Sequence, residues 1–186
     1  MDSIKNYRLK KFITLDAETI EDYITALRFL KPIPTKEEIF YLSLGRVQDI
    51  KEHMAEGKLN NLIQVMKWVD GREWNYRKEN NVENMRIIEF FSKINSVVEQ
   101  LETIAKAEVT SLTSENSNIK WDAVDGPEKM SVFGIYNTLD RLAGGNILEW
   151  ERVLKLSYAD VFTKLYMDRV KNDLEYQMSK IKTDVQ

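Results

Sequence analysis

The stretch WERVLKLSYADVFTKLYMDRVKNDLEYQM, residues 150–178, predicts a short helix, a bend and then a long helix. An earlier stretch, IFYLSLGRVQDI at residues 39–50, resembles it. Residues 39–47 align without a gap with residues 153–161, and both contain a Leu-Ser step followed four residues later by Val. A Ser ahead of a helical pattern accepts the backbone N–H of the second or third helical residue, so Ser43 and Ser157 are predicted N-caps. Asp160, three residues after Ser157, completes an acidic capping box. The repeat is either an old duplication or a chance recurrence in a Leu-rich chain.

Apolar residues recur at steps of three and four along most of the chain, which predicts an all-α fold, a multi-helix bundle with two long helices. One long helix is expected over about residues 82–110, and the other over about residues 158–182. The first has the cleaner stripe, formed by Ile87, Phe90, Ile94, Val97, Leu101 and Ile104. About two and a half heptads are short for an independent coiled coil, so this helix is expected to pack in an antiparallel bundle or against copies of itself.

Helix starts and breaks divide the sequence into parts of one expected domain. Asp16 is a predicted N-cap, and Thr35 with Glu38 and Asn146 with Glu149 are predicted capping pairs. Gly126-Pro127 opens a helix expected to run through residues 130–143 to Gly144-Gly145. The expected parts are an extended N-terminal arm (1–15), a helical subdomain (16–70), a loop and the first long helix (71–110), a loop (111–127) and a C-terminal helical part (128–186).

Composition and charge exclude several classes of protein. The chain has 186 residues, a formal net charge of -3 and no Cys. Its acidic and basic residues are interspersed, so nucleic-acid contact is expected to be incidental. The start of the sequence lacks the apolar run of a signal peptide, and no window reaches the roughly 18 apolar residues of a membrane span. We therefore expect a soluble protein without disulfides, thiolate metal sites or a membrane partner.

No reactive constellation is readable, so the sequence predicts a protein that is not an enzyme and holds no cofactor. The single His, His53, lies four residues after Asp49, and a surface His beside a carboxylate explains the pair better than a metal site does. The seven glycines form neither a Gly-x-Gly-x-x-Gly nor a P-loop pattern. Carboxylates are plentiful, but nothing selects two of them as an acid and a base.

Four segments are candidate interaction surfaces. The arm offers Tyr7, Arg8, Lys10, Lys11 and Phe12; the loop after residue 70 offers Trp74 and Tyr76; the loop at 111–125 offers Trp121; and the far half of the last helix offers Val170, Leu174 and Met178. Large aromatic residues often anchor interfaces, which is why the loop with Trp74 and Tyr76 is included.

Each of these surfaces has a structural alternative. The arm lies on a neighbouring subunit, packs on its own domain, frays as termini do or binds phosphate. The aromatics of the 71–81 loop bind a partner or fold back over the local core. The apolar band of the last helix shifts around the helix midway, which indicates either a second partner for its far half or ordinary curvature around one core.

The repeated Leu-Ser-(Tyr/Leu)-(Ala/Gly)-x-Val step, in a Cys-free helical chain rich in Lys, Glu, Asn and Ile, resembles small helical proteins of tailed bacteriophages of the crAss-like type. The resemblance covers residues 39–50 and 150–178 and implies a head-to-tail connector or ring component. A ring of identical subunits in the virion, contacting portal, connector or tail proteins, is then expected. A tail-assembly chaperone is the alternative, and a small cytoplasmic helical regulator or enzyme is a second one.

Overall fold

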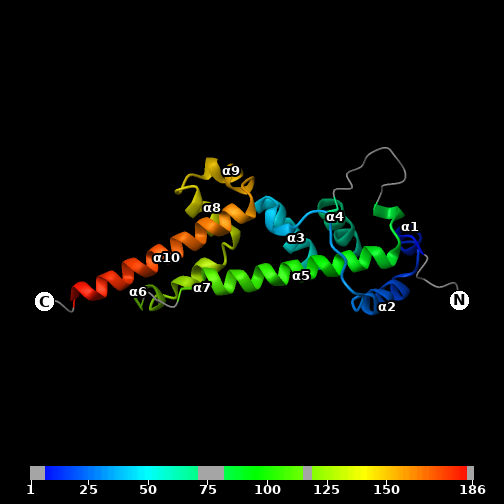
Figure 1. Cartoon of the computed structure of the whole chain (residues 1–186), viewed down its shortest axis with the longest axis horizontal. Helices are drawn as coiled ribbons and strands as arrows, with labels where there is room; N and C mark the ends of the chain where they lie inside the picture. The colour runs from blue at the N-terminus through cyan, green and yellow to red at the C-terminus, as the bar shows by residue number, and fades with distance from the viewer. Residues whose placement is uncertain (1–6, 71–81, 115–118, 184–186) are drawn as a thin grey trace. The chain divides into compact units, whose positions relative to one another are not determined.

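The computed structural model describes residues 7–70, 82–114 and 119–183, and the described residues form helices, turns and two isolated β-bridges without a β-strand (Figure 1). The all-α prediction is confirmed, as are its two long helices, α5 (Ile87–Leu112) and α10 (Tyr158–Thr183). The chain forms two compact units. Unit 1 is Met1–Leu42 with Val47–Ile104, and unit 2 is Ser43–Arg46 with Ala105–Gln186.

Unit 1 has the larger core. Its elements are α1 (Leu9–Phe12), α2 (Ala17–Leu27), η2 (Ile39–Tyr41), most of α3 (Leu44–Glu56), α4 (Leu59–Val69), η3 (Val82–Asn84) and the first part of α5. Phe12 meets Phe91 edge to face at 6.1 Å between ring centroids, and Phe90 meets Phe91 at 5.2 Å. Such perpendicular ring pairs are a favoured way to fill a core. The apolar stripe of α5 therefore lies in the core of unit 1.

The predicted extended N-terminal arm is wrong over its described part. Leu9 and Phe12, both 0% exposed, form the buried side of α1. Arg8 and Arg86 form an antiparallel bridge, in which Leu9 N donates to Met85 O at 2.9 Å and Ile87 N donates to Tyr7 O at 2.8 Å. The first amides of a helix lack intrahelical acceptors. Here a carbonyl just before each helix accepts the first amide of the other helix. The segment thus packs on its own unit.

The two copies of the Leu-Ser motif also meet start to start. Ser43 and Ser157 form an antiparallel bridge within unit 2, and Leu44 N donates to Leu156 O at 2.8 Å. Ser157 Oγ accepts Asp160 N at 3.1 Å and donates to the Asp160 carboxylate at 2.6 Å. Ser43 Oγ accepts the backbone N–H three residues on at 3.4 Å, so both predicted N-caps are confirmed. The repeated motif thus marks the place in unit 2 where these two helix starts are bonded to each other.

Unit 2 is built from shorter helices. After the end of α5 come α6 (Ile119–Asp122), α7 (Gly126–Ser131), α8 (Ile135–Leu142), η4 (Ile147–Glu149), α9 (Trp150–Leu154) and α10. Its buried side chains include Leu44, Leu139, Val153, Tyr158 and Val161. This core is small for the number of helices around it, and much apolar surface stays outside.

Several predicted boundaries in unit 2 need correction. The loop expected over 111–127 is partly helical, because α5 continues to Leu112 and α6 lies inside it. The single helix expected over 130–143 is broken at Gly134, whose φ of +48° is open to glycine at little steric cost. The helix start at Gly126-Pro127 and the ending at Gly144-Gly145 are confirmed. The Asn146 cap is also confirmed, since its side chain accepts Leu148 N at 3.1 Å.

Candidate interaction surface

Three side-chain hydrogen bonds join α10 to the end of α5 and the residues that follow it. Tyr158 donates its hydroxyl to the Glu108 carboxylate at 2.5 Å. Arg169 Nε donates to Ser111 O at 3.1 Å. Asp173 accepts Ser114 Oγ at 2.6 Å. These three residues of α10 lie within about 60° of one another at 3.6 residues per turn, so they define its inner face.

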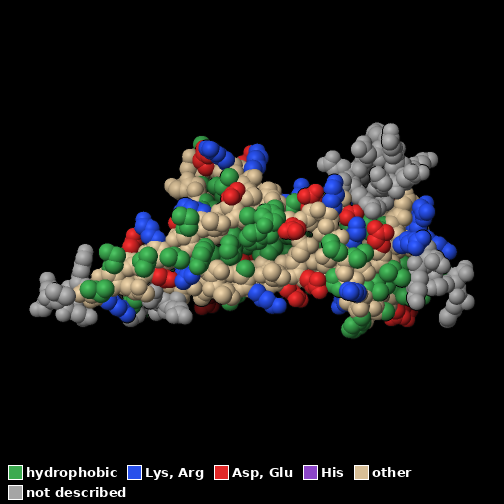
Figure 2. Space-filling view, viewed as in Figure 1, with side chains coloured by type: hydrophobic (Ala, Val, Ile, Leu, Met, Phe, Trp, Pro, Cys, Tyr) green, Lys and Arg blue, Asp and Glu red, His purple; other side chains and the backbone are tan. Residues whose placement is uncertain are grey.

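Another face of α10 presents an apolar row to solvent. Met167 is 63% exposed, Leu174 54%, Met178 57% and Ile181 64%, and Val170 between them is half-buried. Successive members are three or four residues apart, and the row is centred about 130° around the helix from the inner face. We call these five residues the outer row. Figure 2 shows hydrophobic side chains following one another along α10.

Ion pairs accompany α10 along its length. Lys171 and Glu175 form an exposed i,i+4 pair at 3.7 Å beside the outer row. Asp168 accepts a hydrogen bond from Lys164 and pairs with Arg141 at 3.2 Å, and these contacts lower the pKa of the Asp168 carboxyl. Exposed pairs contribute little stability, and the pair of Lys171 and Glu175 sets the charge pattern beside the row.

The fold clearly alters the titration of the Tyr158 hydroxyl. Burial raises the pKa of Tyr158, and the hydrogen bond to Glu108 raises it further. The hydroxyl therefore stays protonated and donates to the carboxylate across the physiological range. Its role is to anchor the first turn of α10.

A second exposed apolar area lies at the turns around α8 and η4. Its large side chains are Val132, Phe133, Tyr136, Ile147 and Leu148. Gly134, with its positive φ, follows directly after two of them and separates α7 from α8. Unit 2 therefore exposes apolar side chains both on α10 and at these turns. Large exposed apolar patches on a folded protein typically mark contacts with other proteins.

The candidate residues near the N-terminus are mostly used by unit 1 itself. Phe12 is fully buried, so its predicted role as an exposed contact is corrected to a core role. The Lys11 ammonium lies 4.0 Å from the centroid of the Tyr7 ring, and Arg8 forms the bridge to the start of α5. Lys10 is exposed. The alternation over residues 7–13 misled the prediction, whereas the three-residue step from Leu9 to Phe12 could have indicated the short helix.

The remaining candidates divide into three cases. Trp74 and Tyr76 lie outside the described residues. Trp121, 47% exposed, covers Gly126 so closely that an added Cβ there would lie 2.4 Å from the indole ring. Leu174 and Met178 are exposed as a contact surface requires, and their role as contacts stays a prediction. Met167 and Ile181 belong to the same row by spacing, and the candidate set lacked them.

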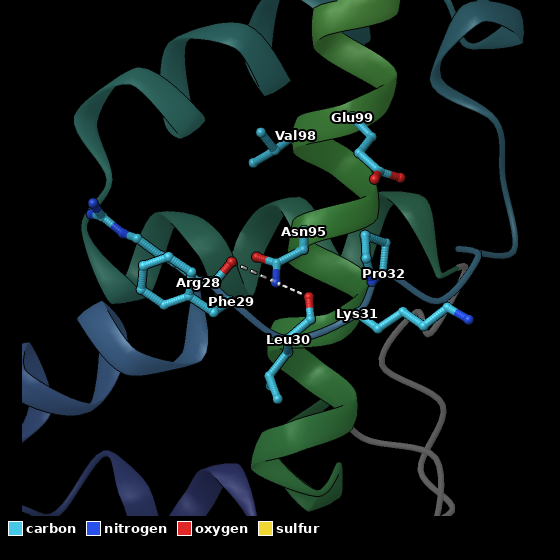
Figure 3. Close-up of a pocket in the computed structure, with 8 residues that line it drawn as sticks. All are labelled: Arg28, Phe29, Leu30, Lys31, Pro32, Asn95, Val98 and Glu99. Atoms are coloured by element: carbon cyan, nitrogen blue, oxygen red, sulfur yellow. Dashed lines mark hydrogen bonds between the residues drawn. The ribbon is translucent and has the colours of Figure 1, made fainter.

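A shallow hollow of about 310 Å³ lies between the end of α2 and the middle of α5 (Figure 3). At its floor Asn95 Nδ2 lies 3.3, 3.2 and 2.8 Å from the carbonyl oxygens of Leu27, Arg28 and Leu30. The last carbonyls of a helix lack intrahelical donors, so Asn95 closes the end of α2. The Asn95 amide in this hollow is thus engaged in holding the fold.

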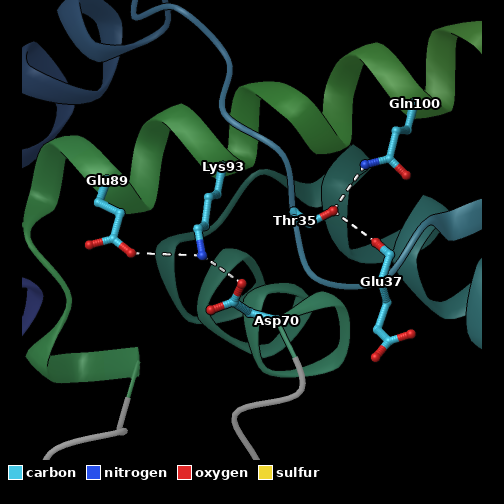
Figure 4. Close-up of polar contacts among 6 residues, drawn as sticks. All are labelled: Thr35, Glu37, Asp70, Glu89, Lys93 and Gln100. Atoms are coloured by element: carbon cyan, nitrogen blue, oxygen red, sulfur yellow. Dashed lines mark hydrogen bonds and ion pairs between the residues drawn. The ribbon is translucent and has the colours of Figure 1, made fainter.

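A second polar cluster lies on α5 where it meets the end of α4 (Figure 4). Lys93 Nζ is 2.6 Å from Asp70 Oδ1 and 3.7 Å from Glu89 Oε1. The Asp70 side chain is 5% exposed and the Lys93 side chain 14%, so this pair is largely withdrawn from water. It joins the end of α4 to α5 and is structural by its position.

Gln100 replaces the capping box predicted at Thr35 and Glu38. Ile39 N donates to Gln100 Oε1 at 2.8 Å, and Gln100 Nε2 donates to Thr35 Oγ1 at 3.0 Å. Thr35 donates in turn to a backbone carbonyl two residues on, at 2.8 Å (Figure 4). Thr35 thus donates to a carbonyl instead of accepting the amide of Glu38, so the predicted box is wrong. A side chain 61 residues away in the chain accepts the first amide of η2.

His53 serves the packing of α3 on α4. Its Nδ1 lies 2.9 Å from the backbone oxygen of Asp49, and its ring meets Trp68 at 5.0 Å. Over the part of the chain that the structure describes, no three His, Asp or Glu side chains gather as metal ligands would. None of the described helices is both long and apolar enough to cross a lipid bilayer.

No protein-family model, curated protein or solved structure shows a significant match to this chain.

Proposed function

We propose that this chain is a non-enzymatic structural protein, a subunit of an oligomeric ring in the head-to-tail connector or tail of a tailed bacteriophage. The observation that carries the proposal is the large apolar surface of unit 2. The outer row of α10 and the turns around α8 both expose large hydrophobic side chains. Association with other proteins removes such surface from water, which is the dominant favourable term in most protein assembly.

Two separate apolar areas suit a subunit with more than one neighbour. In a ring each subunit meets one neighbour through one surface and the next neighbour through a different surface. The outer row and the α8 turns are different surfaces of this kind. The phage assignment comes from the resemblance of residues 39–50 and 150–178 to small connector and ring proteins.

Mass spectrometry of purified phage particles tests the proposal. A ring component is expected at a fixed number of copies per particle, in a constant ratio to the portal protein, in every preparation. Absence of the chain from washed, infectious particles would overturn the ring assignment.

The same experiment separates the ring from a tail-assembly chaperone. A chaperone is expected in infected cells but not in finished particles, bound to an elongated tail-length protein. The outer row fits that alternative as well, because an apolar helix face accepts an amphipathic helix of a client. Copy number in the finished particle decides between the two.

A further inference from the structure

We propose that α10 joins two copies of this chain as an antiparallel helix pair, with the outer row of one copy packed on the outer row of the other. The proposal goes beyond the ring assignment and does not depend on it, because it concerns the free protein. Its basis is the spacing, exposure and charge of residues 167–181.

The row has the spacing that a second helix recognises. Met167, Leu174 and Ile181 are seven residues apart, and Val170 falls at the intermediate position. A seven-residue repeat of apolar side chains keeps one seam facing a partner helix. The inner face of α10 is engaged with the end of α5, so the outer row is available for such a seam.

The charges beside the row identify the occupant as a second copy in the antiparallel direction. A two-fold axis between residues 172 and 173 places Met167 level with Met178 of the second copy. It also places Val170 within one residue's rise, about 1.5 Å, of the height of Leu174 in that copy. Lys171 then lies within about 1.5 Å of the height of Glu175 of the second copy, on the flank that the two copies share. In a parallel pairing the flank that carries Lys171 and Glu175 would instead face the opposite flank of the second copy, so these charges would not meet across the seam.

The size of the row indicates a reversible pair. From Met167 to Ile181 the helix advances about 21 Å, and a ridge about 10 Å wide over that length is well below the roughly 800 Å² per partner of a standard stable interface. The pair is therefore expected to form and dissociate with protein concentration. A two-fold contact joins only two copies and does not itself close a larger ring. The pair keeps the outer row covered until another partner replaces the second copy.

Charge exchange between two variants is the decisive test. K171E leaves only acidic side chains at positions 171 and 175, and E175K leaves only basic ones, so each variant alone faces two like-charge contacts in the antiparallel pair. We expect sedimentation equilibrium to show each variant self-associating about tenfold more weakly than wild type, from two reversed surface ion pairs. An equal mixture of the two restores both attractions and is expected to regain wild-type association.

The mixture separates contacts between copies from contacts within one helix. The i,i+4 pair of Lys171 and Glu175 is lost in both variants, so its loss cannot explain recovery on mixing. A mixture that associates no better than its components would overturn the antiparallel pairing. Wild-type protein that stays monomeric up to millimolar concentration would overturn the self-association altogether.

A matched pair of charge substitutions tests the apolar row itself. L174D places a carboxylate in the row and is expected to abolish self-association. N172D places the same charge two residues away on an exposed position outside the row, and is expected to leave association within twofold of wild type. Far-UV circular dichroism and melting show whether both variants keep the fold. If L174D and N172D associated equally well, the outer row would not be part of the interface.

The direction of the pair can be read by cysteine crosslinking, because the chain has no native Cys. M167C mixed with M178C is expected to form the mixed disulfide preferentially. In the antiparallel pair, residue 167 is offset from its own counterpart by eleven residues, about 16 Å along the axis, too far for a disulfide. Preferential M167C–M167C and M178C–M178C products would show a parallel pair and contradict the proposal.

Discussion

The ion pair of Lys93 and Asp70 offers the sharpest test of how unit 1 is held together. Replacing Lys93 by Ala leaves the Asp70 carboxylate, whose side chain is 5% exposed, without the ammonium at 2.6 Å. An exposed pair contributes about 0–1 kcal/mol, whereas breaking a buried pair from one side costs about 3–5 kcal/mol. Because Lys93 keeps 14% exposure, we expect K93A to lower the free energy of unfolding by about 3 kcal/mol, the lower end of the buried range.

The double variant D70N/K93M separates the penalty of losing one partner from the net contribution of the pair. Replacing both partners by neutral groups of similar shape is often close to neutral, so most of the loss in K93A should be recovered. E89Q removes the more distant carboxylate, at 3.7 Å, and is expected to change stability by less than about 1 kcal/mol.

Urea unfolding followed by circular dichroism measures these differences, with hydrogen exchange of α4 assigning the transition to unit 1. The slope against urea should stay constant, so that a shifted midpoint reports stability. A loss below about 1 kcal/mol in K93A would show that the pair behaves as an exposed one. A double variant as unstable as K93A would refute the reasoning that the charge left on Asp70 causes the loss.

Substitutions at three further positions and one pH series test other parts of the account. F12A should lower the free energy of unfolding by about 3–5 kcal/mol, since Phe12 is fully buried. A change near zero in urea titration would show that this segment is peripheral to the fold of unit 1. N95A should cost about 1 kcal/mol and N95D more, because a carboxylate would face the carbonyls that end α2; equal losses would contradict this role. S157A should cost about 1 kcal/mol through loss of the cap, measured by thermal melting with S157T as the conservative control. Burial and Glu108 raise the pKa of Tyr158, so above pH about 10 the tyrosine ionises in the unfolded state before it does in the folded state. The free energy of unfolding therefore falls as the pH rises from there. Y158F should make this fall less steep, and an unchanged slope would contradict the role of Tyr158.

The parts of the fold that the sequence could predict are those set by local spacing. The stripe of α5, the length of α10 and the Ser157 cap each depend on residues within a few turns of one another. Gly134 shows the limit of that reasoning: the apolar spacing on either side of it reads as one helix, yet its positive φ divides the segment into two. A single backbone angle thus decides what a periodicity cannot.

The parts that the sequence could not predict depend on partners distant in the chain. Gln100 caps an amide 61 residues earlier, so no local rule selects it. The bridge between Ser43 and Ser157 in unit 2 joins residues far apart in the chain, although the repeated motif marks both places. Nor does spacing alone tell which of the two apolar bands of α10 is buried, because both have helical periodicity. Contacts with the end of α5 show which one is inside.

Hydrogen exchange along α10, measured in the full chain over a range of concentrations, tests most directly the claim that this protein acts through the apolar surface of unit 2. Amides over residues 167–181 are expected to become more protected as concentration rises, while those of α4, in the core of unit 1, stay constant. Protection of residues 167–181 that is the same at every concentration would contradict the claim.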